Sequence, residues 1–527
     1  MRFLKRHFRK RVFRKTSAWD GAFGPVEARR VWNQMVETLT LENVIRALGG
    51  CTQICAGLAD RVSNVTVDSR QARAGSLFVA LPGDQVDGHR YVPDALARGA
   101  IAAIVERDVD CATVLDLRNP MHAPEGGESV SSLPVCFRVN DSLAALQQIA
   151  SWWRAQFDVR VVGITGSIGK TTTKEFIASV LAQRYCVLKS EGNYNNEIGL
   201  PLTLLQLGRS HERVVLEMGT YGPGEITLLT GIARPEIGVV TNVGPVHLER
   251  MGTVERIAEC KSELPRALPA DGTAILNADD ERVRSMAEVT RAHVLTYGLS
   301  RASDLWADEV ESYGLEGVSL TFHDARSQGC DRVIRAHIPL VGRHSVYTAL
   351  RAAAVGLVEG LSWEEILRGL GAGEPLRLVA VPGIHESTLL DDTYNSSPDS
   401  AIAALDLLAE LDGRKIGVLG DMLELGAHEA EGHCRVGRRA VDAVSFLITV
   451  GERSHLIGES AIKHGMTPER VIHVADNVAA VSRLRQLVHA GDVILIKGSR
   501  GMAMEEIVHA LARSPAEAAA KGGSKDN

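Results

Sequence analysis

A glycine-rich stretch, GITGSIGKTTT at residues 163–173, carries the residue types that hold a phosphate group. Small residues let backbone N–H groups approach phosphate oxygens, and the start of a following helix adds a positive dipole end. Lys170 supplies a positive charge, and the Thr171 hydroxyl can bind Mg2+. The glycine spacing is irregular, because Ile164 stands where the common pattern has glycine. The stretch therefore predicts a phosphate loop of a variant class.

Further polar residues follow apolar runs. Glu217 ends the run VVLE, where its carboxylate could complete a Mg2+ shell begun by Thr171. His247 follows IGVVTNVGPVH, although a lone histidine is more often a surface or core residue than a metal ligand. Lys261, in AECKSEL, is interpreted on its own as a helix lysine in water. NADD at 277–280 ends another run, and helix capping and nucleotide contact are both open for it.

The elements that would position these residues alternate between strands and helices. The runs VVGIT, VVLEMG, IGVVTNV, TAILNA and HVLTYG are nearly continuous in apolar residues, which is typical of a parallel sheet covered on both faces. Ligands of such sheets bind at the carboxyl ends of the strands. The alternating stretch 304–341 predicts added antiparallel strands.

The predicted fold class is α/β with three domains. Residues 35–158 are expected to form an N-terminal α/β domain, with strands at SLFVAL and AIAAIVE. Residues 159–373 are expected to form a central P-loop ATPase-like, doubly wound parallel sheet. A second series of apolar runs at 374–513 predicts a C-terminal Rossmann-like α/β domain. The polar strand ends of both series suggest a cleft that would hold ATP.

Two terminal segments are expected to lie outside these three domains, and one segment inside the first domain is expected to form a loop. Residues 1–34 are strongly basic and lack an apolar h-region, which argues against a secretory signal. Met35 directly precedes the first ordered pattern, so we expect it to be the genuine start and 1–34 to be an extension without a structural role. Residues 119–134 are rich in Pro and Gly and predict a loop. Residues 514–527 predict a disordered tail.

The bulk composition excludes several classes of protein. The net charge of -7 gives no global electrostatic reason to expect nucleic acid as a partner. The 8 cysteines include no C-x-x-C pair, so neither a zinc site nor a disulfide framework is indicated, and a reducing cytoplasm fits best. No apolar run approaches the ~18 residues that a membrane span needs.

Taken together, these motifs resemble those of the Mur ligase family. The similarity is carried in one order by TGSIGKTTT, NYNNEIGLP, VLEMG, TNVGPVHLERMGT, AECKSEL, ILNADD, DDTYNSSPDS, VLGDMLELG and KGSRGM. Residues 67–95 resemble that family's N-terminal uridine-nucleotide domain, and the resemblance runs from about Met35 to Leu511. YNSSPDS and VLGDMLELG are similar to the branch that joins D-alanyl-D-alanine to UDP-N-acetylmuramoyl-tripeptide in peptidoglycan precursor synthesis.

This resemblance implies an ATP-dependent amide ligase. The γ-phosphate of ATP would pass to the C-terminal carboxylate of the UDP-linked tripeptide, and the amine of D-Ala-D-Ala would attack the resulting acyl phosphate. Activation is needed because a carboxylate is a poor acyl donor at neutral pH. The resemblance further implies ATP and two Mg2+ ions as cofactors, and we expect a monomer with no integral membrane segment.

The resemblance also implies roles for individual residues. The catalytic residues would be Lys170, Glu217, His247 and Lys261. Thr171 and Glu217 would hold the first Mg2+, and His247 the second, supported by Lys261 as a carbamate, which is an anion. ATP would be bound by Thr165, Gly166, Ser167, Ile168, Gly169, Lys170, Thr171, Thr172, Asn277, Arg377 and Asp392. The substrate would be bound by Ser69, Arg70, Asn195 and Asn196.

Some positions depart from the family pattern. Ser345 stands where the family's G-x-H-N segment has asparagine. The arginine motif is usually closer to G-R-L-E, and around Arg377 it reads PLRLVAVPG. Asp391 and Asp392 are adjacent, so the sequence leaves open which of them would face the ribose.

Three alternatives compete with this interpretation. A sibling ligase that adds a single amino acid is the nearest, but the D-N-P-R stretch of diaminopimelate-adding members is absent. Folylpolyglutamate synthase shares the core but lacks the uridine-type N-terminal domain. A nucleotide-dependent switch would explain the phosphate loop yet leave Glu217, His247 and Lys261 unrelated to one another.

Overall fold

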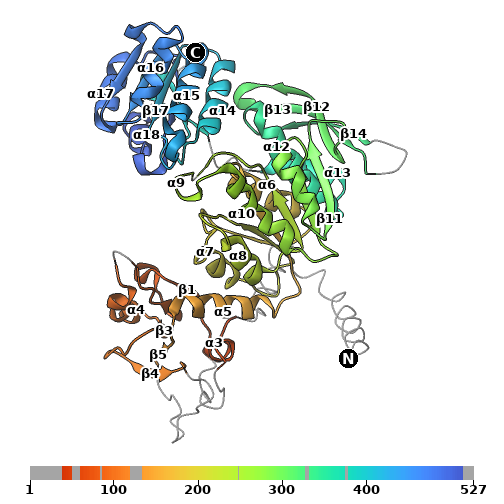
Figure 1. Ribbon diagram of the computed structural model, residues 1–527. Coiled ribbons are helices and arrows are strands. Elements are labelled where there is room, and N and C mark those ends of the chain that lie inside the picture. Colours follow the sequence, from red (N-terminus) through yellow and green to blue (C-terminus); the bar gives the residue numbers. More distant parts are fainter. Residues whose placement is uncertain are drawn as a thin grey trace, which may run out of the picture. The chain divides into compact units, whose positions relative to one another are not determined.

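The computed structural model describes residues 38–49, 60–83, 86–118, 133–246, 248–326, 332–373 and 378–513 (Figure 1). The predictions for residues 1–34 and 514–527, for His247, for Arg377 and for nearly all of 119–134 lie outside this described part. The chain divides into two compact units, Met1–Asp158 with Leu204–Glu212 and Val159–Thr203 with Arg213–Asn527. The predicted domain boundaries stay predictions.

The first unit contains a parallel sheet of five strands in the order β1-β2-β3-β5-β4. The strands are β1 (Asn64–Thr66), β2 (Ser76–Val79), β3 (Ala102–Val105), β4 (Thr113–Asp116) and β5 (Val135–Arg138). Its helices are α3 (Leu41–Ala47), α4 (Val92–Ala97) and α5 (Ser142–Arg154). The runs SLFVAL and AIAAIVE form β2 and β3, so both predicted strands are confirmed.

The segment 204–212 belongs to this unit although it lies far along the chain. Trp153 of α5 donates its Nε1–H to the Leu207 carbonyl oxygen at 3.1 Å. Trp153 is 4% exposed and Leu207 is 3% exposed, so the contact is buried. The unit is therefore completed by a segment that follows the phosphate loop in sequence.

The second unit contains a sheet of nine strands in the order β14-β13-β12-β11-β10-β9-β6-β8-β7. Its strands are β6 (Arg160–Thr165), β7 (Val187–Lys189), β8 (Arg213–Glu217), β9 (Ile237–Val240), β10 (Thr273–Asn277), β11 (His293–Gly298), β12 (Leu305–Ser312), β13 (Val318–Asp324) and β14 (Arg332–Ile338). The strands from β7 to β12 pair in parallel, whereas β12, β13 and β14 pair antiparallel, as predicted for 304–341.

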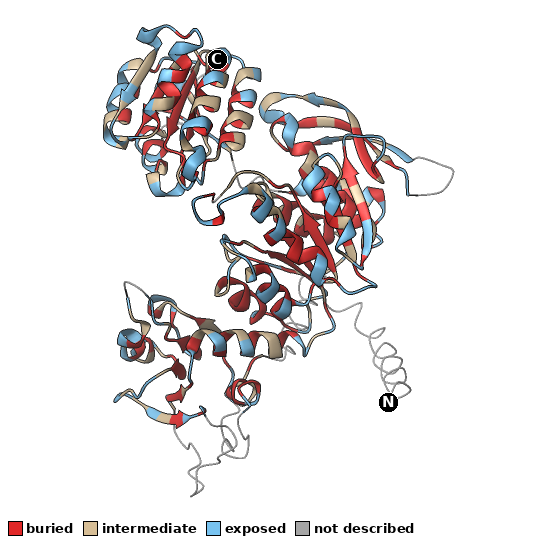
Figure 2. Ribbon diagram, in the orientation of Figure 1, coloured by how far each residue is buried: buried red, intermediate tan, exposed pale blue. Residues whose placement is uncertain are grey.

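Helices cover both faces of the parallel part of this sheet. The core on one face is formed with α6 (Lys170–Leu181), α12 (Val346–Val358) and α13 (Trp363–Ala372). The core on the other face is formed with α9 (Leu248–Met251), α10 (Val254–Ala267) and α11 (Glu281–Arg284). Two further helices, α7 (Gly199–Leu204) and α8 (Glu225–Ala233), complete this part. Because both faces are covered, the strands are buried along most of their length (Figure 2).

A third sheet of six strands follows in the order β15-β16-β20-β17-β18-β19. Its strands are β15 (Val379–Pro382), β16 (Thr388–Asp391), β17 (Lys415–Gly420), β18 (Phe446–Val450), β19 (Val471–Val474) and β20 (Val493–Lys497). One face packs on α14 (Pro398–Glu410), α15 (Glu429–Ala443) and α16 (His455–Lys463), and the other on α17 (Asn477–Leu487) and α18 (Glu505–Leu511). The α/β fold class is confirmed.

One strand of this sheet was not predicted. β15 pairs antiparallel with β16 at the edge of the sheet and ends at Pro382. Proline lacks the N–H that an interior strand needs, so an edge position accommodates it.

Within the described residues, no helix combines the length and the apolar character needed to cross a bilayer.

Candidate active site

The phosphate loop connects β6 to α6, as the sequence predicts. Gly169 precedes α6 with φ +82°, and Gly166 has φ +144°. A Cβ atom on Gly166 would lie 1.9 Å from Thr241 Oγ1, so this position requires glycine both for its backbone angle and for space. The loop therefore runs directly against the end of β9.

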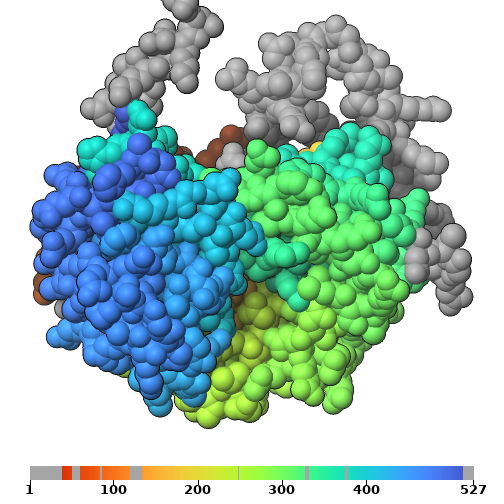
Figure 3. Space-filling view, turned by 90° about the horizontal axis from the view of Figure 1, so that it is seen from above, coloured from red at the N-terminus to blue at the C-terminus, as the bar shows by residue number. Residues whose placement is uncertain are grey.

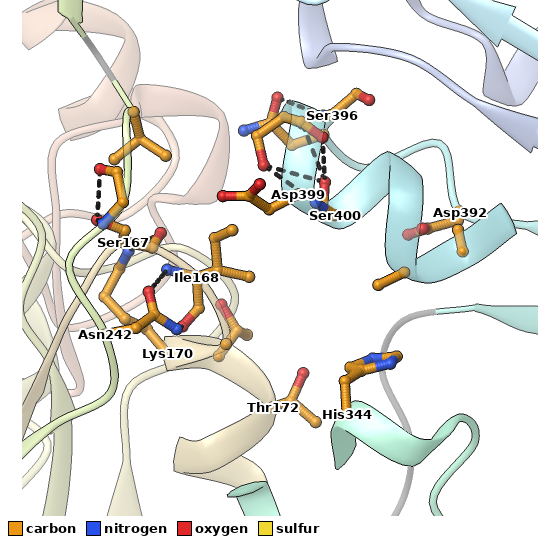
Figure 4. A pocket seen from close by; sticks show the side chains of 18 of the residues that line it. Ser167, Ile168, Lys170, Thr172, Asn242, His344, Asp392, Ser396, Asp399 and Ser400 are labelled. Carbon is orange, nitrogen blue, oxygen red and sulfur yellow. Dashed lines mark hydrogen bonds between the residues drawn. The ribbon is translucent and has the colours of Figure 1, made fainter. Parts of the chain in front are cut away.

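Residues after β9 hold the loop in place. Asn242 accepts from Ile168 N with Oδ1 at 3.0 Å and donates with Nδ2 to Ile168 O at 3.2 Å (Figure 4). Thr241 Oγ1 donates to Ile168 O at 2.7 Å, and Ser167 Oγ donates to Gly244 O at 3.0 Å. We call this set, Thr241, Asn242 and Gly244, the loop clasp. It fixes the shape of the loop through the protein's own hydrogen bonds.

The predicted pairing of Thr171 with Glu217 is in place. Thr171 Oγ1 donates to Glu217 Oε2 at 2.9 Å, and Asn195 Nδ2 donates to Glu217 Oε1 at 2.9 Å. The Glu217 residue is 3% exposed. A carboxylate and a hydroxyl side by side suit Mg2+, which commonly takes one or two carboxylates and completes its shell with substrate phosphates and water. No group of three or more His, Cys, Asp or Glu side chains that could hold a metal occurs within the described ranges.

Lys170 lies over the loop that precedes it. Its Nζ donates to Gly166 O at 2.8 Å and to Ser167 O at 3.3 Å. The positive charge is therefore held directly at the position where the loop would receive phosphate oxygens.

Lys261 is buried, and its interpretation as a helix lysine in water is wrong. It is 3% exposed and lies on α10, on the helix face that also buries Ile257 and Leu264. Burial first, and the nearby charge of Lys170 second, lower the pKa of Lys261 to about 7. The apolar residues at i−4 and i+3 were the sequence signal for this buried face.

Lys261 and Lys170 both line a small cavity of about 60 Å³. Gly166, Asn195 and Asn196 also line it, so five predicted site residues meet there. Asn196 Oδ1 accepts from the Gly199 backbone N–H at 2.9 Å, at the start of α7. Asn196 thus supports the local backbone, whereas Asn195 contacts Glu217 directly.

A larger cavity of about 630 Å³ lies within the second unit. One side comes from the phosphate loop and the start of α6, including Ser167, Lys170 and Thr172. The opposite side comes from the six-stranded part, including Asp392 and Ser396 (Figure 4). Figure 3 shows a face on which the surface is hollowed between the green and blue segments of this unit. The cavity is large enough for a nucleotide-sized ligand.

Asp392, rather than Asp391, lines this cavity. Lys497 Nζ donates to Asp392 Oδ2 at 2.6 Å. Asp391 instead accepts from the backbone N–H and the hydroxyl of Thr393, at 3.1 and 2.7 Å. Of the two adjacent carboxylates, Asp392 is therefore the one available to a ligand in the cavity.

The NADD segment caps a helix and also lines the large cavity, whereas its contact with a nucleotide stays a prediction. Asp280 caps α11 by accepting from Arg282 N at 3.0 Å. Asn277 lines the large cavity, and its Nδ2 donates to Thr241 O at 3.1 Å. The segment thus links the cavity wall to the loop clasp.

Several residues of the cavity were not predicted as site residues. Asn242, His344, Tyr347, Arg351 and Lys497 all line it. Asn242 and Lys497 each come at the end of an apolar strand run, which is the signal by which Glu217 was found. The other three lie at and just beyond the GRHS segment, where Ser345 had drawn attention.

Ser69 and Arg70 lie in the first unit, in a short 3-10 turn after β1. Ser69 is 7% exposed. The side chain of Arg70 is 82% exposed and pairs with Asp68 at 2.8 Å. Its hydrogen bond to Asp68 lowers the pKa of that carboxyl. Arg70 Nε and Nη2 both donate to the Asp68 carboxylate, and the binding of substrate by Arg70 stays a prediction.

Comparison with known protein families gives three matches along the chain. Residues 61–152 match the model described as Mur ligase family, catalytic domain. Residues 164–356 match the Mur ligase middle domain, and residues 377–500 match the model described as Mur ligase, glutamate ligase domain.

Individual relatives cover nearly the whole chain. The UDP-N-acetylmuramoyl-tripeptide--D-alanyl-D-alanine ligase of Synechocystis sp. is 36% identical over 487 residues, which cover 90% of this chain and 98% of the relative. The ligase of the same name from Bacillus subtilis is 36% identical over 459 residues, covering 86% and 94%.

Solved structures resemble the whole chain as well. A crystal structure of MurF from Acinetobacter baumannii matches with a TM-score of 0.77 and 28% identity, covering 90% of this chain and 98% of that one. The structure of MurF ligase from Thermotoga maritima in complex with ADP matches with a TM-score of 0.70 and 27% identity, covering 85% and 97%.

Proposed function

Because the chain belongs to the Mur ligase family, we propose that it joins D-alanyl-D-alanine to UDP-N-acetylmuramoyl-tripeptide with ATP as the energy source. The observation that carries the proposal is the phosphate loop lying beside the Thr171–Glu217 pair and the buried Lys261. Relatives at 36% identity that cover most of the chain bear the name of this ligase.

ATP would bind in the large cavity with its phosphates on the loop. Lys170 would contact the β- and γ-phosphates, and the amide groups at the start of α6 would add a positive dipole end. Asn277 and Asp392 would contact the nucleoside from the cavity wall. The likeness to a MurF structure that contains ADP supports this assignment.

Bound Mg2+ would supply positive charge at the phosphate oxygens during transfer. Thr171 and Glu217 would hold the first ion, since they present adjacent oxygen atoms. Lys261 would support a second ion only as a carbamate, because an ammonium would repel it. The lowered pKa of Lys261 favours carbamylation, since only the neutral amine reacts with CO2. His247 would be the other ligand of this second ion.

The proposed reaction has two steps. The tripeptide carboxylate attacks the γ-phosphorus, ADP leaves, and Lys170 stabilises the negative charge of the transferring group. The amine of D-Ala-D-Ala then attacks the carbonyl carbon of the acyl phosphate to form a tetrahedral intermediate. The C–O bond to phosphate breaks, phosphate departs, and the proton lost from the amine passes to solvent. Asn195 orients Glu217 through its hydrogen bond, which keeps the carboxylate oxygen beside Thr171 in position.

We further propose that the enzyme acts as a monomer in the cytoplasm. The described cysteines Cys111, Cys136, Cys186, Cys260 and Cys434 are free thiols, which is in keeping with a reducing compartment. Size-exclusion chromatography with light scattering tests the oligomeric state.

The decisive experiment varies the amine acceptor. The purified protein is incubated with ATP, Mg2+ and UDP-N-acetylmuramoyl-tripeptide, together with either D-Ala-D-Ala or single amino acids. We expect phosphate release that depends on the dipeptide, and a product heavier by the mass of D-Ala-D-Ala less water. Product formed only with a single amino acid would indicate the sibling ligase. ATP hydrolysis without any coupled product would indicate a nucleotide-dependent switch.

A further inference from the structure

Arg351 is a buried guanidinium at the phosphate loop, and the reaction proposed above assigns it no role. It lies on α12 and is 4% exposed. It lines the large cavity. Its Nη2 is 3.4 Å from the position that a Cβ atom on Gly169 would occupy. The guanidinium therefore approaches the loop from α12, at the residue directly before Lys170 and α6.

The protein leaves the charge of Arg351 without a counterion. Nη2 donates to Thr348 Oγ1 at 3.0 Å, and Cζ lies 5.9 Å from the centroid of the Tyr297 ring. Nε is buried without a hydrogen-bond partner. Over the described ranges, no carboxylate lies within the 4.0 Å ion-pair distance of this guanidinium. The Tyr297 hydroxyl also forms a side-chain hydrogen bond with Arg351, but burial raises the pKa of this hydroxyl, so this neighbour is neutral and is no counterion.

A buried cation with a free donor is strongly unfavourable unless an anion reaches it. The two cations beside the loop, Lys170 and Arg351, come from different helices, and both line the same cavity. An arginine presents its donors in a rigid fork that matches the oxygens of a phosphate group. The missing counterion is thus best supplied by the phosphate chain of a nucleoside polyphosphate.

We infer that Arg351 binds the phosphate chain of the nucleotide from α12, as a second phosphate-contacting cation of this site beside Lys170. The inference rests on the proposed function, because it takes the cavity to be the nucleotide site. It adds to that function a residue that neither the sequence pattern nor the assigned site residues include.

The test compares Arg351→Met with Arg351→Lys and with the control Arg343→Met. Arg343 lies eight residues earlier, is exposed, and does not line the cavity, so its replacement makes the same change in charge outside the site. Calorimetry measures the affinity of each protein for ADP and for adenosine. Thermal unfolding without nucleotide measures stability.

We expect Arg351→Met to bind ADP at least about tenfold more weakly, which is the effect of losing one charge-assisted hydrogen bond. Its affinity for adenosine should not change, and Arg351→Lys should be intermediate. Without nucleotide, Arg351→Met should be at least as stable as the wild type, because an uncompensated buried charge is replaced by an apolar chain of similar length. Arg343→Met should bind ADP as the wild type does.

Two results would overturn the inference while leaving the proposed function intact. One is an unchanged ADP affinity in Arg351→Met when the wild type binds ADP. The other is an equal loss of affinity for ADP and adenosine together with a lower unfolding temperature, which would make Arg351 a packing residue. A wild-type protein that does not bind ADP at all would instead reject the proposed function, and with it this inference.

Discussion

At the scale of single residues, Lys170 is the group on which phosphoryl transfer depends most directly. Its ammonium donates hydrogen bonds to the carbonyl oxygens of Gly166 and Ser167 in the phosphate loop. We expect Lys170→Ala to lower kcat by a factor on the order of 10^3 or more, because several kcal/mol of transition-state stabilisation are lost. Lys463→Ala, at an exposed helix end, is the control. Ligation by folded Lys170→Ala at close to the wild-type rate would refute the role of Lys170.

Lys261 is the residue whose proposed chemistry differs most from what its sequence context alone indicates. We expect Lys261→Ala to be nearly inactive and to regain activity in part when short carboxylic acids are added, since these would occupy the place of the carbamate. Lys261→Arg should be inactive, because arginine keeps the charge but cannot be carbamylated. Initial rates of product formation measure both effects. Normal activity of Lys261→Arg would exclude the carbamate.

The same burial predicts a dependence of stability on pH. The pKa of Lys261 is about 7 in the folded chain, against an ordinary value of 10.5. Below pH 7 Lys261 is protonated in both the folded and the unfolded chain. The buried positive charge then lowers the free energy of unfolding by its full amount. Between these two pKa values the unfolded chain binds more protons, so the free energy of unfolding rises with pH.

The measurement is the unfolding temperature of the wild type minus that of Lys261→Met, in buffer free of CO2 and Mg2+. This difference should increase between pH 7 and about pH 9, which lies between the two pKa values. A difference that stays constant with pH would show that Lys261 does not titrate in this range.

At the scale of elements, the parallel strands were the easiest features to predict. HVLTYG forms β11 with the predicted bounds, and its later residues Leu295, Tyr297 and Gly298 are buried between the two layers. β15 was missed because it is a short edge strand of 4 residues that ends at a proline. The burial of Lys261 was missed because a charged side chain is usually exposed. That expectation was given more weight than the apolar residues on the same face of the helix.

The candidate site was predicted where a chemical group follows a strand in sequence. Glu217 was found on that basis and Thr171 from the phosphate-loop motif; the structure joins them by a hydrogen bond at 2.9 Å, and their role in holding Mg2+ stays a prediction. Arg351 could not be found in this way, because it lies inside a helix among small apolar residues. Only the packing of α12 against α6 brings it to the loop, and that packing is a tertiary contact without a local sequence signal.

The geometry of the loop predicts opposite effects of two glycine substitutions. Gly166→Ala should destabilise the protein by roughly 1–3 kcal/mol, because the new Cβ would meet Thr241 at a backbone angle that alanine rarely adopts. Gly231→Ala should stabilise it by up to about 1 kcal/mol, since Gly231 lies in α8 with no atom near its missing Cβ. Urea unfolding measures both. Equal effects would show that the loop tolerates a side chain.

At the scale of the whole molecule, the first unit is formed by two separate stretches of the chain. The segment 204–212 completes it, through the hydrogen bond between Trp153 and Leu207. We expect a fragment of residues 38–158 to be less stable than the same fragment with 204–212 attached through a flexible linker. The tryptophan emission of the shorter fragment should lie at longer wavelength, because Trp153 would contact water. Identical urea unfolding and emission of the two fragments would contradict this.

The loop clasp has a consequence for the timing of nucleotide binding. Hydrogen bonds of the protein itself already hold the loop at Thr241, Asn242 and Gly244. Nucleotide binding therefore requires no rearrangement of the loop. Association should then be a single encounter whose observed rate increases linearly with nucleotide concentration in stopped-flow measurements. ATP and ADP should arrive at similar rates and differ chiefly in residence time, so the lifetime of each complex would decide which nucleotide occupies the enzyme between turnovers.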